Sequence, residues 1–258
     1  MYFFTHWLPL ALFASTFLTG FATAVPILDN GGVVIPGPPA DPPKPSGDGQ
    51  GVWGREDPGI KDRLHKIEYS NLLKAVPSSY GHAATNLRHY LDNTGTTFAN
   101  KPEDIMNDIP AFKAAVLGTA KHYASAAFSF VDSGTGGIKA FSSGWVGFYA
   151  TPELDKDWYY ALGGFSYAVA GTVKTRKVGS AWVGDLAYKV YIFDRYNWDG
   201  DKNTTILWFT VTDKEMGHLH VVGLAREYIV RGSSGVFGVP AWNGKAASLP
   251  PPVTGGRS

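Results

Sequence analysis

Hydrophobic residues between positions 60 and 131 recur every three to four residues, which is the spacing of one face of an α-helix. The pattern predicts helices over 60–76, 80–91 and 110–130. Pro77 stops the first helix, and the proline that opens the third suits a first turn, where no backbone N–H is needed. We therefore expect a helical first half.

Over residues 138–246, apolar residues alternate with small or polar ones, as in strands with one buried face. Strands are predicted over 165–173, 186–193 and 205–211. Asp199-Gly200 lies between the last two and favours a tight turn, because Gly tolerates positive φ. This turn would make the last two strands a hairpin.

Thr212 and Glu215 match a capping box that opens a short helix, which Gly223 can end before a strand over 227–231. Together the elements predict an α+β fold. Its N-terminal helices would pack on an antiparallel sheet that could close into a barrel, and residues 60–246 would form a single domain.

The two ends of the chain differ in composition from this domain. An apolar run over 8–21 is followed by Ala22-Thr23-Ala24, which has the small-x-small pattern of a signal peptidase site. We predict a signal peptide over 1–24. Residues 25–59 are rich in Gly, Pro and Asp and are predicted to be a disordered linker or a cleaved propeptide, between which the sequence does not decide. The tail over 247–258 is also predicted to be disordered.

The charge and composition exclude several classes of partner and chemistry. The formal net charge is +1, from 23 Lys and Arg against 22 Asp and Glu, so no nucleic-acid partner is expected. The signal segment is shorter than the roughly 20 apolar residues of a membrane span, so we expect no stable membrane anchor. The absence of Cys excludes thiol catalysis, thiolate metal sites and disulfides.

The densest polar cluster lies over 194–203. On a strand, Asp194 and Tyr196 share one face and would place a carboxylate beside a phenol, a pairing suited to general-base catalysis. The alternative is that Asp194 pairs with a neighbouring Arg and that the cluster is a solvated turn.

His218 and His220 would lie about 200° apart on the capped helix, on opposite sides, which disfavours a shared metal. We expect His218 to be exposed and His220 to be partly buried and hydrogen-bonded, although an inward His could act in catalysis. Arg226 could reach the same end of the sheet, either to pair with a carboxylate or to bind a substrate phosphate. The candidate catalytic residues are Asp194, Tyr196, His220 and Arg226.

Asp199, Asp201 and Asn203 have the alternating oxygens that open a calcium loop. Thr204 and Thr210 stand where that loop needs Gly and Glu, so we predict no metal site. Asn203 also begins an N-glycosylation sequon, whose use the sequence leaves open.

Two groups of aromatic residues could stack on the sugars of a glycan or fill the space between sheet and helices. They are Trp145, Phe148 and Tyr149, and Trp158, Tyr159 and Tyr160. The chain lacks Gly-x-Ser-x-Gly, His-Glu-x-x-His, a phosphate-binding glycine loop and the Glu-x-Glu pair of ADP-ribosylating toxins. No cofactor is predicted, and whether the protein is an enzyme stays open.

Four segments are distinctive together, namely 89–95, 158–167, 194–199 and 224–228. They resemble a domain at the C-terminal end of exported, toxin-like bacterial proteins of the polymorphic-toxin type, and the likeness covers residues 80–235. The resemblance implies a secreted effector that acts on another cell, and it transfers no catalytic residue.

Asp194-x-Tyr196 also resembles part of the Asp-x-Tyr-Asp motif of colicin M-type bacteriocins, which cleave the lipid-linked peptidoglycan precursor. Asn197 replaces the second Asp in this sequence, and the His-Arg pair that follows in that family is missing.

We therefore predict a secreted, toxin-like effector that acts outside the producing cell, with hydrolysis through Asp194 and Tyr196. Its partner would be a component of the cell exterior or of a target cell. The alternative is a non-enzymatic binder of cell-wall glycan or a surface protein through exposed aromatic residues, and a third possibility is a structural wall protein. The reaction, the target cell and the oligomeric state cannot be read from the sequence.

Overall fold

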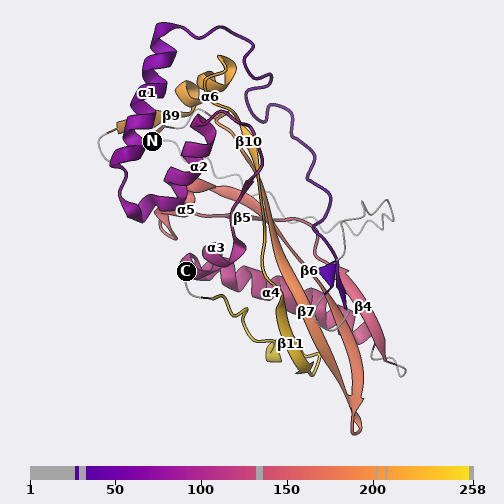
Figure 1. The fold of residues 1–258 in the computed structure, drawn as a ribbon. Coiled ribbons are helices and arrows are strands. Elements are labelled where there is room, and N and C mark those ends of the chain that lie inside the picture. The colour runs from indigo at the N-terminus through magenta and orange to yellow at the C-terminus, as the bar shows by residue number, and fades with distance from the viewer. Residues whose placement is uncertain (1–26, 29–32, 132–135, 201–202, 207–208, 256–258) are drawn as a thin grey trace, which may run out of the picture.

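The computed structural model describes residues 27–28, 33–131, 136–200, 203–206 and 209–255, which form the α+β fold that the sequence predicts (Figure 1). The helices are α1 (Ile60–Ala75), α2 (Gly81–Leu91), α3 (Pro102–Asp108), α4 (Pro110–Val131), α5 (Lys156–Ala161) and α6 (Asp213–Val221), with short 3₁₀ turns at Ser78–Tyr80 and Ala246–Ser248. Periodicity therefore located α1, α2 and α4 correctly, whereas it missed the two shortest helices, α3 and α5.

A seven-stranded sheet forms the centre of the molecule. Its strands are β3 (Phe98–Ala99), β4 (Gly137–Ser142), β5 (Val146–Tyr149), β6 (Gly164–Val178), β7 (Ala181–Tyr196), β10 (Tyr228–Ser233) and β11 (Phe237–Trp242). The order is β3-β10-β7-β6-β4, and β11 pairs with β7 and β5 with β6. The pairing is antiparallel except between β3 and β10, which are parallel. The sheet is thus mixed and, over the described residues, does not close into a barrel.

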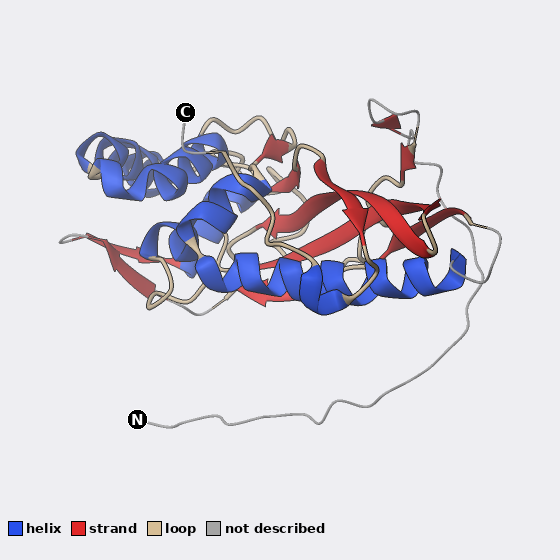
Figure 2. Ribbon diagram, turned by 90° about the horizontal axis from the view of Figure 1, so that it is seen from below, coloured by secondary structure: helices blue, strands red, loops and turns tan. Residues whose placement is uncertain are grey.

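The long strands β6 and β7 carry the alternation that the sequence predicts. Val169 is paired with Val190, and both point into the main core beneath α4. Ala168 and Tyr191 are paired on the opposite face and form a separate small cluster. Figure 2 shows α4 lying along the sheet while most of the other helices gather at one end. Fully buried alanines of α4, such as Ala120 and Ala124, let this helix approach the sheet closely.

The predicted hairpin between 186–193 and 205–211 is wrong. The strand β7 pairs with β6, β10 and β11, and the described residues of 205–211 belong instead to a two-stranded sheet of β8 (Asn203–Ile206) and β9 (Phe209–Thr212). Gly179, which has a φ of 62°, allows the turn that joins β6 to β7. Both edges of β7 are therefore already hydrogen-bonded to other strands of the large sheet.

Residues 33–59 also differ from the disordered linker that their composition predicts. Residues 33–56, here called the strap, run along the sheet from β2 (Val34–Ile35) to the start of α1 (Figure 1). The strap is held because its carbonyls accept hydrogen bonds from side chains of the sheet, for example Pro36 O from the Tyr191 hydroxyl at 2.9 Å. Proline removes backbone donors and leaves these acceptors available.

The predicted disordered tail is likewise packed as far as residue 255. Leu249 is buried in the main core, and Asn107 of α3 donates a hydrogen bond to Gly255 O at 2.9 Å. The predicted signal peptide over 1–24 lies outside the described residues. No helix in the described part of the chain is long and apolar enough to cross a membrane.

Gly171 of β6 provides a test of this packing. A Cβ atom at Gly171 would lie 2.6 Å from Ala187 O and 2.7 Å from the ring of Phe141, so Gly171→Ala should destabilise the fold by about 1–3 kcal/mol. Gly147→Ala in β5 is the matched control, because its Cβ would meet no atom within 4 Å. Denaturant unfolding of both variants measures the difference, and equal midpoints would contradict the β4-β6-β7 packing.

Candidate functional site

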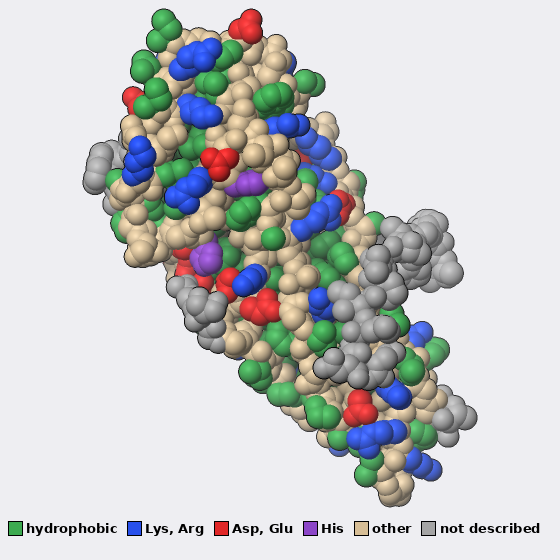
Figure 3. All heavy atoms as spheres, in the orientation of Figure 1, with side chains coloured by type: hydrophobic (Ala, Val, Ile, Leu, Met, Phe, Trp, Pro, Cys, Tyr) green, Lys and Arg blue, Asp and Glu red, His purple; other side chains and the backbone are tan. Residues whose placement is uncertain are grey.

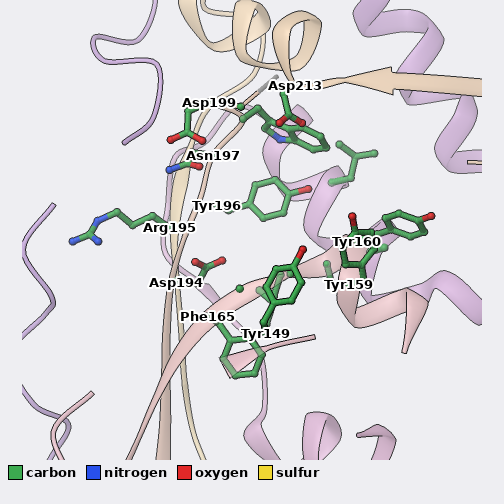
Figure 4. Close-up of a pocket in the computed structure, with 18 of the residues that line it drawn as sticks. Tyr149, Tyr159, Tyr160, Phe165, Asp194, Arg195, Tyr196, Asn197, Asp199 and Asp213 are labelled. Atoms are coloured by element: carbon green, nitrogen blue, oxygen red, sulfur yellow. The ribbon is translucent and has the colours of Figure 1, made fainter. Parts of the chain in front are cut away.

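A pocket of about 690 Å³ lies at the helical end of the sheet, between the C-terminal part of β7, the helices α1, α2 and α5, and the strap (Figure 4). One wall of the pocket is lined by apolar and aromatic side chains, and one end of the pocket is lined by polar side chains. The apolar wall includes Leu72, Val76, Leu87, Phe148, Tyr149, Tyr159, Tyr160, Leu162 and Phe165. The polar end includes Asp48, Asp194, Arg195, Asn197, Asp199 and Asp213.

The strand β7 presents Asp194 and Tyr196 on the same face, as the alternation predicts. Asp194 is opposite Val230 and Tyr196 is opposite Tyr228 in β10, and both Asp194 and Tyr196 line the pocket. Arg195 leaves β7 on the other side from Tyr196 (Figure 4). The core beneath α4 ends before this position, so the side-chain row that is apolar at Val190 and Ile192 continues into the pocket as Asp194.

Asp194 is partly exposed to the pocket, and no cation of the described residues lies within 4 Å of its carboxylate. The expected alternative, an ion pair with a neighbouring Arg, is therefore not formed. Removal from bulk water, with an added effect of the Asp48 charge, raises the pKa of Asp194 to about 7 against the opposing effects of the Arg195 N–H and guanidinium. A carboxyl group with this pKa can both accept and release a proton near neutral pH.

Tyr196 is buried, and its ring stacks on that of Tyr228 at 4.7 Å between centroids. Burial, followed by the charge of Asp194, holds the pKa of Tyr196 well above its usual value. The phenol therefore keeps its proton at any physiological pH. It can donate a hydrogen bond to a developing negative charge, whereas the role of a base belongs to Asp194.

The polar end of the pocket is in contact with the strap. Asn197 Nδ2 donates to Asp48 Oδ1 at 2.5 Å, and Arg195 Nε lies 3.6 Å from Asp48 Oδ2. Asp199 accepts a hydrogen bond from Gly49 N at 2.9 Å. The sequence gives no sign of these contacts, because 149 positions separate Asp48 from Asn197.

His220 does not line this pocket. Its Nδ1 accepts from Glu227 N at 3.1 Å and its Nε2 lies 3.2 Å from Gly51 O, so the ring is in the neutral form that carries the Nε2 proton. It is the buried, hydrogen-bonded residue that we expected, whereas His218 is exposed beside Asp62. The Thr212 hydroxyl accepts from Glu215 N, as the predicted capping box requires.

Arg226 also lies away from the pocket, with its guanidinium 4.8 Å from the centre of the Trp53 ring in the strap. The predicted set of four residues is therefore divided. Asp194 and Tyr196 meet in one pocket, and His220 of α6 and Arg226 of the loop after α6 contact the strap at Gly51 and Trp53.

The aromatic residues are divided in the same way. Trp158 is fully buried, stacks on His82 at 4.0 Å and donates from Nε1 to Asp108 at 2.8 Å, so it cannot stack on a glycan. Trp145 donates to Ala40 O in the strap. Tyr149, Tyr159 and Tyr160 do line the pocket, and Tyr149 is 48% exposed.

Among the described residues, no group of three or more His, Asp and Glu side chains is arranged to hold a metal ion. The positions of Asp201 and of the Asn203 side chain lie outside the described atoms. Lys, Arg, Asp and Glu side chains are interspersed over the face seen in Figure 3, in keeping with the net charge of +1.

No protein-family model matches this chain, and no curated protein matches it. Among solved structures, it is similar to PaeM, a colicin M-like bacteriocin produced by Pseudomonas aeruginosa, at TM-score 0.32 and 18% identity over 61% of this chain and 49% of that one. It is also similar to truncated bacteriocin syringacin M from Pseudomonas syringae pv. tomato DC3000, at TM-score 0.27 and 14% identity over 61% of this chain and 57% of that one. The chain thus matches about half the length of these bacteriocins. The identities and TM-scores are too low for the role of any residue to be transferred.

The environment of Asp194 makes the stability depend on pH. Its pKa is raised above the unfolded value of about 4, so its contribution is fully present below pH 4 and is lost as the pH rises through 7. Asp194→Asn has no such titration. The melting temperature of the native protein should therefore fall relative to that of Asp194→Asn between pH 5 and pH 8.

Asp185→Asn is the control on the same strand. Hydrogen bonding to Arg176 lowers the pKa of Asp185, so its contribution changes only at pH values below its unfolded pKa. Its melting curve should stay parallel to that of the native protein between pH 5 and pH 8. A parallel curve for Asp194→Asn as well would contradict the raised pKa.

Proposed function

We propose that the protein is a secreted, toxin-like effector that acts outside the producing cell, and that its pocket hydrolyses an amphipathic substrate with Asp194 as the general base. The observation that carries this proposal is a carboxyl group with a pKa of about 7 that has no cation of the described residues within 4 Å and lies where a polar pocket end meets an aromatic wall. The structural neighbours described above are bacteriocins, the class that the proposal concerns, but the proposal rests on the pocket.

The two ends of the pocket support an amphipathic substrate. Leu72 of α1, Val76 just after α1 and Leu87 of α2 offer an apolar surface for a hydrocarbon or aromatic group. Asp194 and Asn197 come from the end of β7 and its following loop and offer polar groups to the reacting part. A purely polar substrate would leave the apolar wall in contact with water.

The proposed reaction needs only the residues of this pocket and one water molecule. The Asp194 carboxylate accepts a proton from the water as the water oxygen bonds to a carbonyl or phosphoryl centre. The Tyr196 phenol donates a hydrogen bond to the negative charge that develops on the substrate oxygen. The bond to the leaving group then breaks, and the leaving group takes the proton from the Asp194 carboxylic acid.

The alternative proposal is a binder of cell-wall glycan or a surface protein, which Tyr149, Tyr159 and Tyr160 favour because they present rings at the same pocket. Retention on wall material distinguishes the two. Tyr160→Ala should abolish retention by a binder while Asp194→Asn keeps it. If the protein is an enzyme, Asp194→Asn should abolish toxicity to a test cell while Tyr160→Ala keeps it.

Asp194→Asn should lower the toxicity of the protein to a test cell by about 10²–10⁴-fold, because the amide cannot accept the proton from water. Toxicity of the native protein should rise with pH through about 7, as the carboxylate forms. Tyr196→Phe should lower it less, since only a hydrogen bond is lost. Asp185→Asn is the folded control that stays active, and full toxicity of folded Asp194→Asn protein would exclude Asp194 as the base.

Export is a separate prediction, which rests on residues 8–24. Mass spectrometry of a culture supernatant should find a mature N-terminus at Val25 or later. An intact Met1 in a cytosolic fraction would refute it.

A further inference from the structure

We infer that the strap is an autoinhibitory segment, in which Asp48 occupies the Arg195–Asn197 cradle that binds an anionic group of the ligand once the strap is displaced. The inference deepens the proposed function and rests on it for the identity of the site. Its consequence is that the protein has a resting state, with the strap in place, and an open state in which the polar end of the pocket is free.

The strap contacts the polar end of the pocket at successive positions. Arg195 donates from Nη2 to Pro42 O and lies 3.6 Å from the Asp48 carboxylate. Asn197 donates to the other oxygen of Asp48 at 2.5 Å, and Gly49 N donates to Asp199 at 2.9 Å. A carboxylate of the chain itself therefore lies between a guanidinium and an amide, which is where an anionic ligand group would be bound.

The fit of the strap at this point is incomplete. Asp48 Oδ2 is buried and has no hydrogen-bond partner among the described residues, and the same holds for Trp198 Nε1, which belongs to another residue of the pocket. Asp48 Oδ2 therefore has an ion pair with Arg195 at 3.6 Å but no hydrogen bond, so the resting contact leaves hydrogen-bonding capacity unused. A ligand anion with more acceptor oxygens could pair with Arg195, Asn197 and Trp198 together.

The strap is also anchored on both sides of the pocket by hydrogen bonds that do not involve the polar end of the pocket. Upstream, Tyr191 and Trp145 donate to strap carbonyls at 2.9 and 2.8 Å. Downstream, the strap amides of Gly54 and Glu56 donate to His220 O and Val221 O in α6. Between these anchors, the prolines at positions 42, 43 and 45 have no N–H with which to bind the pocket. The middle of the strap can therefore leave while both ends stay in place.

The strap also acts on Asp194. The negative charge of Asp48 is one of the two causes that raise the pKa of Asp194, and the main one is the removal of Asp194 from bulk water. Displacement of the strap would reduce both effects. The Asp194 carboxyl would then be ionised in a larger fraction of molecules near pH 7 when the pocket is open, and the ionised form is the one that a general base needs.

The test compares Asp48→Ala with Asp41→Ala in the full chain. Asp41 is the other acidic residue by which the strap pairs with the sheet, through Arg231, and it does not line the pocket. The probe is 1-anilinonaphthalene-8-sulfonate, which has an anionic group and an aromatic body. If the open form rises from about one tenth of the molecules to nearly all, Asp48→Ala should bind the probe about tenfold more tightly. Asp41→Ala should bind it as the native protein does.

Amide hydrogen exchange gives a readout that does not depend on any activity. In Asp48→Ala, the amides of Gly49 and Gln50, which donate to Asp199 and Glu227, should lose protection. The amides of Gly54 and Glu56 should keep theirs, since their acceptors lie in α6. Asp48→Asn, which keeps the volume of the side chain, replaces Asp48→Ala if the latter fails to fold.

Two double variants of the chain distinguish a failure of this inference from a failure of the proposed function. Adding Arg195→Ala to Asp48→Ala should remove the gain in probe binding, which excludes general loosening of the core. Adding Asp194→Asn should keep the gain but abolish toxicity. If toxicity is absent from every protein while the probe and exchange results hold, the proposed function fails and the strap inference stands. Unchanged probe binding and unchanged protection in Asp48→Ala would make the strap a permanent wall and overturn the inference.

Discussion

Both faces of the strand β7 need to be covered, because large side chains point from it in both directions. Tyr188, Val190 and Ile192 pack beneath α4 on one face, and Tyr191 packs on the other face with Ala168 and Ala170 of β6. Antiparallel sheets usually leave one face to water, and such strands then alternate between apolar and polar residues. Here the second face is covered by the strap. The positions of the pocket and of the strap both depend on how α4 and the strap cover the two faces of this strand.

The pocket lies where the cover of the sheet changes from α4 to the shorter helices. Beneath α4 the interior of the sheet is dry, and further along β7 the same row of side chains reaches Asp194 and Tyr196 between the shorter helices. A carboxyl group at this place is poorly hydrated without being paired, which is why its pKa lies near 7. The strap, which covers the opposite face of β7, bends around the same strand end and brings Asp48 to Arg195 and Asn197. The strand β7 therefore carries core residues along most of its length and residues of the candidate site at its end.

Local pattern predicted the elements of this fold better than their partners. The periods of α4, β6 and β7 are carried by side chains that touch their own core face, so the sequence alone identifies them. In α1 the buried residues are Tyr69 and Leu72, whereas Ile60, Leu64 and Ile67, which share its helical spacing, are exposed. The hairpin between β7 and residues 205–211 was wrong because the Gly179 turn competes with Asp199-Gly200, and pairing through Gly179 forms thirteen residue pairs between β6 and β7, many of them buried. Turn chemistry shows where a chain can reverse, but burial selects which reversal is used.

The strap marks the limit of reading order from composition. A segment rich in Gly and Pro has little apolar area of its own, which is why it is predicted to be disordered. That argument counts only what the segment can bury with itself, whereas the strap is ordered by a surface that is already folded, through carbonyls that accept from Tyr191, Trp145 and Arg195. Proline lowers the entropy that is lost when such a segment is fixed, so a polyproline stretch can lie on a sheet at little cost. The prolines at positions 42, 43 and 45 have no backbone donor, so the hold of the strap on the pocket depends on the side chains of Arg195, Asn197 and Asp199. A segment that is fixed in this way can be ordered and yet be displaced.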